Sequence, residues 1–340
     1  MRLLVTGGAG FIGSNFVSHT LERHPEDSVV VLDKLTYAGN LANLERVAGS
    51  DRFRFVQGDI ADEAVVDRLM ADVDVAVNFA AETHVDRSIM DAGAFIDTDV
   101  RGTWVLLEAA RKHRIQRFLQ VSTDEVYGHV EEGSSRETDN LAPRSPYAAS
   151  KAGGDLMVLA YRTTHGLPVV ITRGSNNIGP YQYPEKVVPV FVTNALDDQP
   201  LPIYGDGGAL RDYIYVTDHC RGIDTALRRG ADGEVYNVGA GNEINTLVLA
   251  RAILRHLGKP ESLMTFVPDR PGHDRRYSVD CSKLMGLGWA PEHTFEQALG
   301  RTIDWYVANE RWWRPLKSGE YLEYYRKNYA ERRAGASGVA

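Results

Sequence analysis

The sequence places a tyrosine and a lysine four residues apart, at Tyr147 and Lys151. On a helix this spacing puts both side chains on one face, one turn apart. A free tyrosine has a pKa of roughly 10 and is a poor base at neutral pH. A neighbouring cation and a position in the first turn of a helix both lower that pKa. We therefore expect a phenolate that takes a proton from a substrate hydroxyl while the carbon beneath gives up a hydride.

A second group with chemical potential is the run Thr123-Asp124-Glu125. Two adjacent carboxyl groups push their pKa values apart, so that one is protonated and the other ionised at the same pH. Such a pair can act as acid and base in an elimination. Spacing alone does not decide which residue takes which role.

A glycine-rich turn at the N-terminus predicts a dinucleotide site. Gly7, Gly10 and Gly13 follow an apolar run and open a helical pattern, as in turns that place a pyrophosphate at a helix N-terminus. Asp33 ends the second apolar run and is expected to accept hydrogen bonds from a ribose 2′-hydroxyl, which favours NAD over NADP. Asp59 is expected either to reach the adenine or to cap the following helix.

The elements that must position these residues alternate between strand and helix in the first half of the chain. This pattern predicts an α/β fold, a Rossmann-like doubly wound parallel sheet with ligands at the carboxyl ends of its strands. A smaller C-terminal substrate-binding domain should follow, giving residues 1–175 and 176–340, with a strand near 235–238 returning to the first domain. Expected strands are 3–6, 29–33, 53–56, 73–80, 118–122 and 169–173; expected helices are 14–23, 61–71, 94–113 and one opened by Ser145-Pro146 that runs to about 165.

Composition narrows the class of protein. The 340 residues are 43% hydrophobic and 25% charged, with a formal net charge of −8, which argues against a nucleic-acid-binding surface. Two cysteines are too few for a disulfide framework, and no stretch has the length and apolar character of a membrane span or a signal peptide. We expect a cytoplasmic protein. Histidines 84, 129, 165, 219 and 273 lack metal-ligand spacing, so no metal is predicted.

Several longer segments share a resemblance. The glycine turn and the Tyr-x-x-x-Lys pair resemble the extended short-chain dehydrogenase/reductase superfamily, and within it the chain looks like the dTDP-glucose 4,6-dehydratases. The similarity extends from residue 5 to about 290. It rests on Asp33-Lys34-Leu35-Thr36-Tyr37-Ala38-Gly39-Asn40, His84-Val85-Asp86-Arg87-Ser88, Ser122-Thr123-Asp124-Glu125-Val126-Tyr127-Gly128, Ser175-Asn176-Asn177 and Asp269-Arg270-Pro271-Gly272-His273-Asp274-Arg275-Arg276.

The resemblance implies a three-stage reaction. Tyr147 would deprotonate the 4-hydroxyl of the sugar while NAD⁺ takes the hydride from carbon 4, and Thr123 would hydrogen-bond the 4-oxygen. Glu125 would then remove the proton on carbon 5 as Asp124 protonates the departing 6-hydroxyl. Hydride would finally return to carbon 6, giving a 4-keto-6-deoxy sugar.

The resemblance also implies binding residues. The cofactor would be held by Gly7, Gly10, Phe11, Ile12, Gly13, Asp33, Lys34, Thr36, Asp59, Ile60, Ala80, Thr98, Tyr147, Lys151 and Asn177. The nucleotide sugar would be held by Thr83, Thr123, Asn176, Lys186, Val187, Pro202, Ile203, Tyr204, Arg211, Asn245, Arg270, His273 and Arg275. Gly174 and Ile178 stand where cysteine and tyrosine are common in the family.

Other interpretations share the same cofactor. A nucleotide-sugar epimerase or decarboxylase would also use Tyr147 and Lys151, but an epimerase needs no acid–base pair to lose the 6-hydroxyl. A non-catalytic NAD-binding sensor would not need the five candidate catalytic residues together. The resemblance implies a homodimer packed through the helix at 94–113 and the helix that carries Tyr147. The nucleobase and the downstream pathway stay open.

Overall fold

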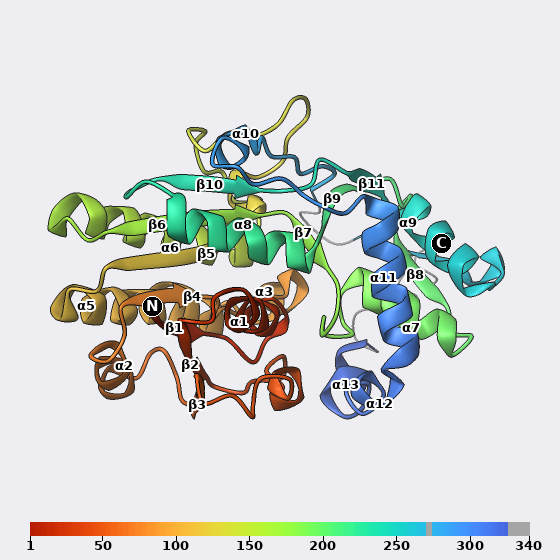
Figure 1. The fold of residues 1–340 in the computed structure, drawn as a ribbon. Helices are drawn as coiled ribbons and strands as arrows, with labels where there is room; N and C mark the ends of the chain where they lie inside the picture. Colours follow the sequence, from red (N-terminus) through yellow and green to blue (C-terminus); the bar gives the residue numbers. More distant parts are fainter. Residues whose placement is uncertain (270–273, 326–340) are drawn as a thin grey trace.

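The computed structural model describes residues 1–269 and 274–325, and seven parallel strands form its central sheet (Figure 1). Most strands are apolar runs buried on both faces, as is typical of parallel sheets. Thr6 pairs with Leu32 on one side and Asn78 on the other, so neighbouring strands end at the same edge. In spatial order the strands are β10 (Val235–Val238), β6 (Val169–Gly174), β5 (Arg117–Thr123), β4 (Val75–Asn78), β1 (Arg2–Thr6), β2 (Ser28–Asp33) and β3 (Phe53–Gln57).

Helices cover both faces of this sheet. On one face α1 (Phe11–Arg23) lies beside α8 (Val216–Arg229), and their apolar sides share a core with β1, β2 and β4. On the other face lie α2 (Glu63–Met70), α5 (Thr103–His113) and α6 (Pro146–His165), around a core that includes Leu106 and Val158. The predicted α/β class, a doubly wound parallel sheet, is confirmed.

Local sequence features explain where these helices begin. The Ser145 hydroxyl accepts a hydrogen bond from Ala148 N at 3.1 Å and Pro146 occupies the first turn, so α6 begins as predicted. The start of α2 differs from the prediction. Its N-cap is Asp62, whose carboxylate accepts from Ala64 N and Val65 N, so Asp59 does not cap this helix.

The segment predicted as one helix over 94–113 has three parts. A short α4 (Gly93–Phe95) leads into a π-helical turn, η2 (Ile96–Gly102), which continues as α5. The wider turn directs Asp99 into the protein, where its carboxylate accepts a hydrogen bond from Ser150 Oγ at 2.6 Å. β4 is also shorter than the predicted 73–80, because residues 79–83 leave the sheet and run along a cavity.

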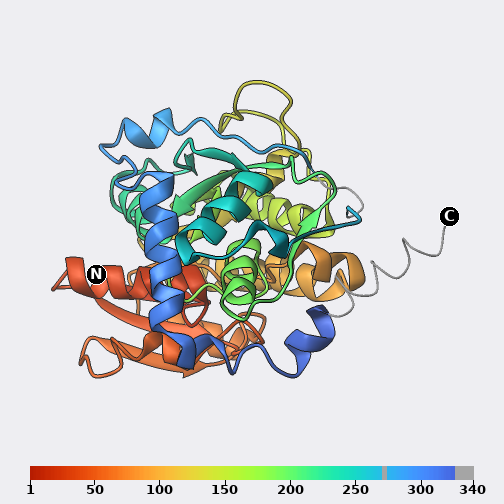
Figure 2. The same ribbon diagram turned by 90° about the vertical axis from the view of Figure 1, so that its right-hand side faces the viewer.

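A second, smaller part of the molecule lies at the carboxyl ends of the strands. Its apolar core includes Phe191, Tyr213 and Ile253, and Figure 2 shows α7, α9 and α11 in front of the main sheet. The elements are β7 (Asn176–Ile178), β9 (Leu210–Tyr215) and β11 (Glu243–Asn245) in one small sheet; β8 (Leu201–Tyr204) and β12 (Met264–Val267) in another; and α7 (Val187–Leu196), α9 (Thr246–Leu257), α11 (Phe295–Ala308), α12 (Glu310–Trp313) and α13 (Glu320–Tyr325).

Shorter elements complete the chain: α3 (Val85–Met90), α10 (Ser282–Met285), η1 (Leu41–Leu44), η3 (Asp124–Tyr127) and η4 (Glu261–Leu263). β10 lies in the main sheet beside β6, at the residues where a returning strand was expected. α8 and α10 also pack on the main sheet, although they come from residues after 175. The described residues contain no helix long and apolar enough to cross a membrane.

Candidate active site

One cavity lies where the main sheet meets the second part of the molecule. It runs from the glycine turn after β1, across the ends of β2 to β6, to the loop before α7. Its wall includes most of the predicted site residues: Gly7, Gly10, Phe11, Ile12, Gly13, Asp33, Lys34, Thr36, Asp59, Ile60, Ala80, Thr83, Thr98, Thr123, Asp124, Glu125, Tyr147, Lys151, Asn176, Asn177 and Lys186.

The glycine turn has no room for side chains. Gly7 has φ +67°, and a Cβ there would lie 2.6 Å from Ala80 N. A Cβ on Gly13 would lie 2.3 Å from the Gly7 carbonyl oxygen, so helix α1 packs directly on the turn. α1 begins at Phe11 after Gly10, whose lack of a side chain leaves the first N–H groups of the helix uncapped. The turn therefore presents backbone donors to the cavity.

Two acidic residues, Asp33 and Asp59, line the part of the cavity at the ends of β2 and β3. Asp33 ends β2, and its carboxylate accepts hydrogen bonds from Ala9 N at 2.9 Å and Leu35 N at 2.8 Å. Burial raises the pKa of Asp33, and these backbone donors oppose the rise. Asp59 forms an ion pair with Lys34 at 2.6 Å. The positive charge of Lys34 is thus paired with Asp59 and is not offered to a ligand beside Asp33. This arrangement disfavours a 2′-phosphate on the ribose.

The tyrosine and lysine of α6 also line the cavity. Lys151 is 4% exposed and its Nζ donates to the Val121 carbonyl oxygen at 2.8 Å, which fixes the ammonium at the end of β5. The ring of Tyr147 packs edge-on against Phe95, with the ring centroids 6.3 Å apart. The phenol also hydrogen-bonds the side chain of Thr123. Tyr147 and Thr123 are therefore in contact, and Lys151 lines the same cavity.

The expected lowering of the Tyr147 pKa is corrected by the structure. Burial raises the pKa of Tyr147 well above its usual value, and the nearby carboxyl groups of Glu125 and Asp99 raise it further. The hydrogen bond with Thr123 lowers it, by less. In the protein alone the phenol is therefore protonated at neutral pH, because desolvation and the nearby carboxyl groups outweigh the hydrogen bond with Thr123.

The adjacent carboxyl groups differ sharply in their surroundings. Asp124 is 3% exposed, and burial, with the neighbouring Glu125 and Asp212, raises its pKa to about 8. Its Oδ1 accepts from the Thr123 hydroxyl at 3.2 Å, whereas its Oδ2 has no hydrogen-bond partner among the described residues. Glu125 is only partly buried. Asp124 thus keeps its proton at neutral pH, as one member of an acid–base pair must.

Residues that the sequence did not single out also line the cavity. His219 of α8 is 1% exposed, and its Nδ1 lies 2.9 Å from Asn177 Oδ1, so it orients the Asn177 amide. Burial lowers the pKa of His219 to about 4, which keeps the ring neutral. A Cβ on Gly174 would lie 2.6 Å from His219 Nε2, so glycine at this position makes room for the ring. The sequence signal that could have pointed to His219 is Gly174, a glycine where cysteine is common in the family.

Several polar atoms on the cavity wall are buried without a hydrogen-bond partner among the described residues, including Asp124 Oδ2, Asn176 Oδ1, Gln182 Oε1 and His219 Nε2. Buried polar groups are normally paired, so this concentration indicates a polar ligand. Together with the glycine cradle and Asp33, these atoms fit a dinucleotide and a polar substrate beside it.

Other predicted substrate residues lie away from the cavity wall. The Ile203 side chain is fully buried in the core of the second part, and Pro202 is buried beside it on β8. Asn245 caps α9, since its Oδ1 accepts from Val248 N at 2.8 Å. Val187 is 37% exposed at the start of α7, and Tyr204 ends β8.

The predicted basic cluster is only partly described. Arg270 and His273 lie outside the described residues. Arg275 is exposed and forms an ion pair with Asp206 at 2.7 Å. Arg211 is buried, donates to the Asp274 carbonyl oxygen at 2.9 Å and lies 4.4 Å from the centre of the Tyr277 ring. The charge of Arg211 lowers the pKa of Asp124, although burial raises that pKa by more. Arg211 therefore lies near Asp124.

Known proteins share this arrangement. A sequence model of the family described as GDP-mannose 4,6 dehydratase matches residues 4–302. The dTDP-glucose 4,6-dehydratase of Streptomyces niveus is 53% identical over 323 residues, which cover 94% of this chain and 96% of that protein. The crystal structure of DesIV, a dTDP-glucose 4,6-dehydratase from Streptomyces venezuelae with NAD bound, has a TM-score of 0.91 at 52% identity and covers 93% of this chain and 100% of that chain.

This chain belongs to the dTDP-glucose 4,6-dehydratase family. The resemblance stated from the sequence is therefore confirmed. A UDP-glucose 4-epimerase from Thermotoga maritima shares the fold, with a TM-score of 0.85 at 30% identity over 91% of this chain and 100% of that one. Because the fold is common to dehydratases and epimerases, the features that set this dehydratase-family chain apart are in the cavity.

Proposed function

We propose that this protein uses NAD to convert dTDP-glucose to dTDP-4-keto-6-deoxyglucose and water. The observation that carries the proposal is the state of Asp124. A carboxyl group with a pKa of about 8 can deliver a proton at neutral pH, and a partly buried carboxyl group lies next to it in the sequence. An epimerase has no leaving group to protonate, so it would gain nothing from this pair.

The chain's own residues divide the work as follows. Bound NAD would supply the redox chemistry, as acceptor of the carbon-4 hydride and donor of the hydride to carbon 6. Tyr147 takes the proton of the 4-hydroxyl in its phenolate form, which the positive charges of Lys151 and of bound NAD would favour, and Thr123 holds the 4-oxygen against it. The resulting 4-ketone acidifies carbon 5. Glu125 removes the carbon-5 proton while Asp124 protonates the 6-hydroxyl, so that the carbon–oxygen bond breaks and water leaves. Glu125 then returns its proton to carbon 5, and the starting state is restored when Tyr147 releases the proton it took and Asp124 takes one up.

In this proposal the cofactor extends from the glycine turn to the catalytic residues, and the sugar lies beside its nicotinamide. Gly7, Gly10 and the first turn of α1 receive the pyrophosphate, and Asp33 binds the adenosine ribose. Asn177, oriented by His219, contacts the nicotinamide. Asn176 Oδ1 and Gln182 Oε1 are free to receive hydrogen bonds from sugar hydroxyls. Lys186, whose Nζ donates to the Thr83 carbonyl oxygen, lies where the diphosphate begins.

The activity is tested directly with purified protein. Incubation with dTDP-glucose should give a product with the alkali-induced absorbance of a 4-keto-6-deoxy sugar, and parallel reactions with UDP-glucose and GDP-mannose measure the preference for the base and the sugar. Lack of product from all three, with NAD bound, would overturn the proposal.

Glu125→Gln separates the oxidation from the elimination. The amide cannot take the carbon-5 proton, so we expect loss of water to slow by about 10²–10⁴-fold. Oxidation at carbon 4 should continue, because Tyr147, Thr123 and Lys151 are unchanged. Mixing the variant with substrate should therefore build up the absorbance of reduced nicotinamide. Dehydration at the wild-type rate would show that Glu125 is not the base.

We also propose that the protein is a cytoplasmic homodimer, joined through α5, α6 and the η2 turn. Ile96, Trp104 and Leu156 expose 56%, 37% and 57% of their surface on these neighbouring elements, a large apolar exposure for an isolated chain. Both cysteines are buried and free, which suits a reducing compartment.

Leu156→Arg tests the dimer. A charge at the centre of an apolar contact should convert the dimer to monomer, measured by light scattering after gel filtration. Val307→Arg is the matched control, because Val307 is 46% exposed on α11, away from this surface. A wild-type monomer, or a Leu156→Arg dimer, would contradict the proposal.

A further inference from the structure

Two histidines and an aspartate meet outside the cavity, between α1 and α8. His19 lies in the third turn of α1, His24 caps the end of the same helix, and Asp224 faces them from α8. His24 Nε2 lies 3.0 Å from Asp224 Oδ2, and His19 Nε2 lies 3.7 Å from the same oxygen. All three atoms lie within 4.8 Å of one another.

The spacing of these atoms suits a metal ion. Donor atoms bound to a tetrahedral Zn²⁺ at about 2.0–2.1 Å stand about 3.3 Å apart. The two measured nitrogen–oxygen distances lie on either side of that value. Small rotations of two imidazole rings would equalise them, without movement of the helices.

The nitrogen of His19 supplies an independent observation. Its Nε2 is buried and has no hydrogen-bond partner among the described residues. A buried imidazole nitrogen that makes no hydrogen bond is costly, and a bound cation would use its lone pair. The proton that His24 shares with Asp224 would be displaced in the same event, because metal ligands must be deprotonated.

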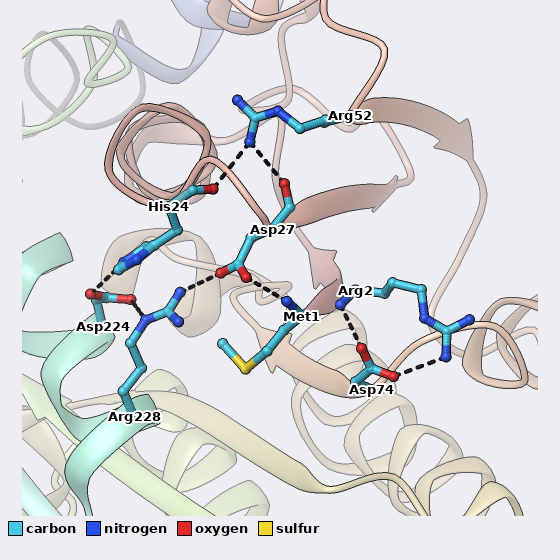
Figure 3. A network of polar contacts seen from close by, with 8 residues as sticks. All are labelled: Met1, Arg2, His24, Asp27, Arg52, Asp74, Asp224 and Arg228. Carbon is cyan, nitrogen blue, oxygen red and sulfur yellow. Dashed lines mark hydrogen bonds and ion pairs between the residues drawn. The ribbon is translucent and has the colours of Figure 1, made fainter.

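Surrounding groups hold the carboxylate in place. Figure 3 shows that Arg228 approaches Asp224 from the side opposite His24, and Arg228 Nε lies 2.6 Å from Asp224 Oδ1. Arg228 contacts one carboxylate oxygen of Asp224 and the two imidazoles face the other, so both oxygens are oriented. Oδ1 is thus held by an outer hydrogen bond and Oδ2 faces the imidazoles, as in metal sites with oriented ligands.

The backbone that carries His24 is also fixed. Arg52 Nη1 donates to the carbonyl oxygens of His24 at 3.1 Å and Asp27 at 2.8 Å. Asp27 in turn accepts hydrogen bonds from Arg228 and from the N-terminal ammonium of Met1. The end of α1 is therefore held in one position relative to α8 before any ion binds.

We propose that His19, His24 and Asp224 form a binding site for a divalent transition-metal ion, with Zn²⁺ the best match. Two imidazoles and one carboxylate favour Zn²⁺, Co²⁺ or Ni²⁺ over Mg²⁺ and Ca²⁺, which prefer oxygen ligands. Water completes the coordination, since His24 is 27% exposed. None of the three ligands lines the catalytic cavity, so the ion clamps α1 to α8 and takes no part in the reaction.

Zn²⁺ binding to the full chain, prepared without a histidine tag, tests the site. Competition with a chromogenic chelator should show one Zn²⁺ per chain, and Mg²⁺ should not compete. His19→Ala removes a ligand but no hydrogen bond, so the fold is preserved, and affinity should fall at least about tenfold. Zn²⁺ should raise the melting temperature of the wild type and leave that of His19→Ala unchanged.

His256→Ala is the matched control, because His256 pairs with a single carboxylate, Asp304, at 2.8 Å and belongs to no group of metal-ligating side chains among residues 1–269 and 274–325. It should bind Zn²⁺ as the wild type does. His24→Ala is a second ligand variant and should weaken binding like His19→Ala. The proposal is overturned if no stoichiometric Zn²⁺ binds, or if His19→Ala and His256→Ala bind it equally.

Discussion

Replacing Asp124 by asparagine should slow the loss of water by about 10²–10⁴-fold and at the same time stabilise the protein. Asparagine keeps the shape of the side chain, and its oxygen can still accept the hydrogen bond from Thr123. It cannot give up a proton, so the 6-hydroxyl leaves unaided. Oxidation at carbon 4 should remain, and reduced nicotinamide should accumulate when substrate is added.

The gain in stability follows from the raised pKa. Burial and the neighbouring Glu125 raise the Asp124 pKa to about 8, against roughly 4 in the unfolded chain. Between these values the native state holds a proton that the unfolded state has released, so this residue costs more stability as the pH rises. The asparagine removes that cost, and at pH 7 the free energy of unfolding should rise by on the order of 2–4 kcal/mol.

Urea unfolding of the wild type and Asp124→Asn at several pH values tests whether the substitution raises the free energy of unfolding. The advantage of Asp124→Asn should be small at pH 4 and grow towards pH 8. Asp27→Asn is the contrast: burial raises that pKa, but the N-terminal ammonium and Arg228 lower it below its usual value, so this variant should be less stable than the wild type at neutral pH. An Asp124→Asn advantage that does not change with pH would show that Asp124 is ionised. Wild-type dehydration should also decline above about pH 8 as Asp124 loses its proton.

Tyr147→Phe should abolish the first step. The substitution removes only the phenolic oxygen, so the ring contact with Phe95 is kept and NAD should stay bound. Without the oxygen, the 4-hydroxyl loses the group proposed to take its proton, and oxidation should slow by about 10²–10⁴-fold. No reduced nicotinamide should appear on mixing with substrate, which separates this variant from Asp124→Asn and Glu125→Gln.

Tyr161→Phe is the matched control on the same helix. Its hydroxyl bonds Glu108 on α5 and does not line the cavity, so activity should match the wild type. Because the pKa of Tyr147 is raised, the oxidation rate of the wild type should increase with pH through the neutral range. A Tyr147→Phe variant that oxidises substrate normally would assign the base to another group.

The features that could be predicted from the sequence are those determined by a few neighbouring residues. Gly7 and Gly13 mark a turn that no other residue fits, and Ser145-Pro146 starts α6 where the N-cap rule places it. The start of α6 in turn determines that Tyr147, in its first turn, lines the cavity. Family resemblance supplied the roles of the acids, and the structure adds why Asp124 and Glu125 differ: one is buried and the other is not.

What sequence could not supply depends on packing between distant segments. His219 orients Asn177 only because α8 folds back over β6, and His19 meets Asp224 across two helices. The Tyr147 pKa was expected to fall, since the nearby lysine is visible in the sequence, whereas the desolvation that raises it is not. The π-helical turn that buries Asp99 likewise has no local signature that we recognised.

The position of β10 affects how the protein is made. β10 closes the outer edge of β6, yet its residues leave the ribosome after the whole stretch 175–238 has been translated. At about 5–20 residues per second this takes about 3–13 s. During that interval the apolar strand β6 is an open edge on a nascent chain, the kind of template on which neighbouring polypeptides can pair. Synthesis of residues 175–238 therefore determines when the edge of β6 is covered and can no longer pair with other chains.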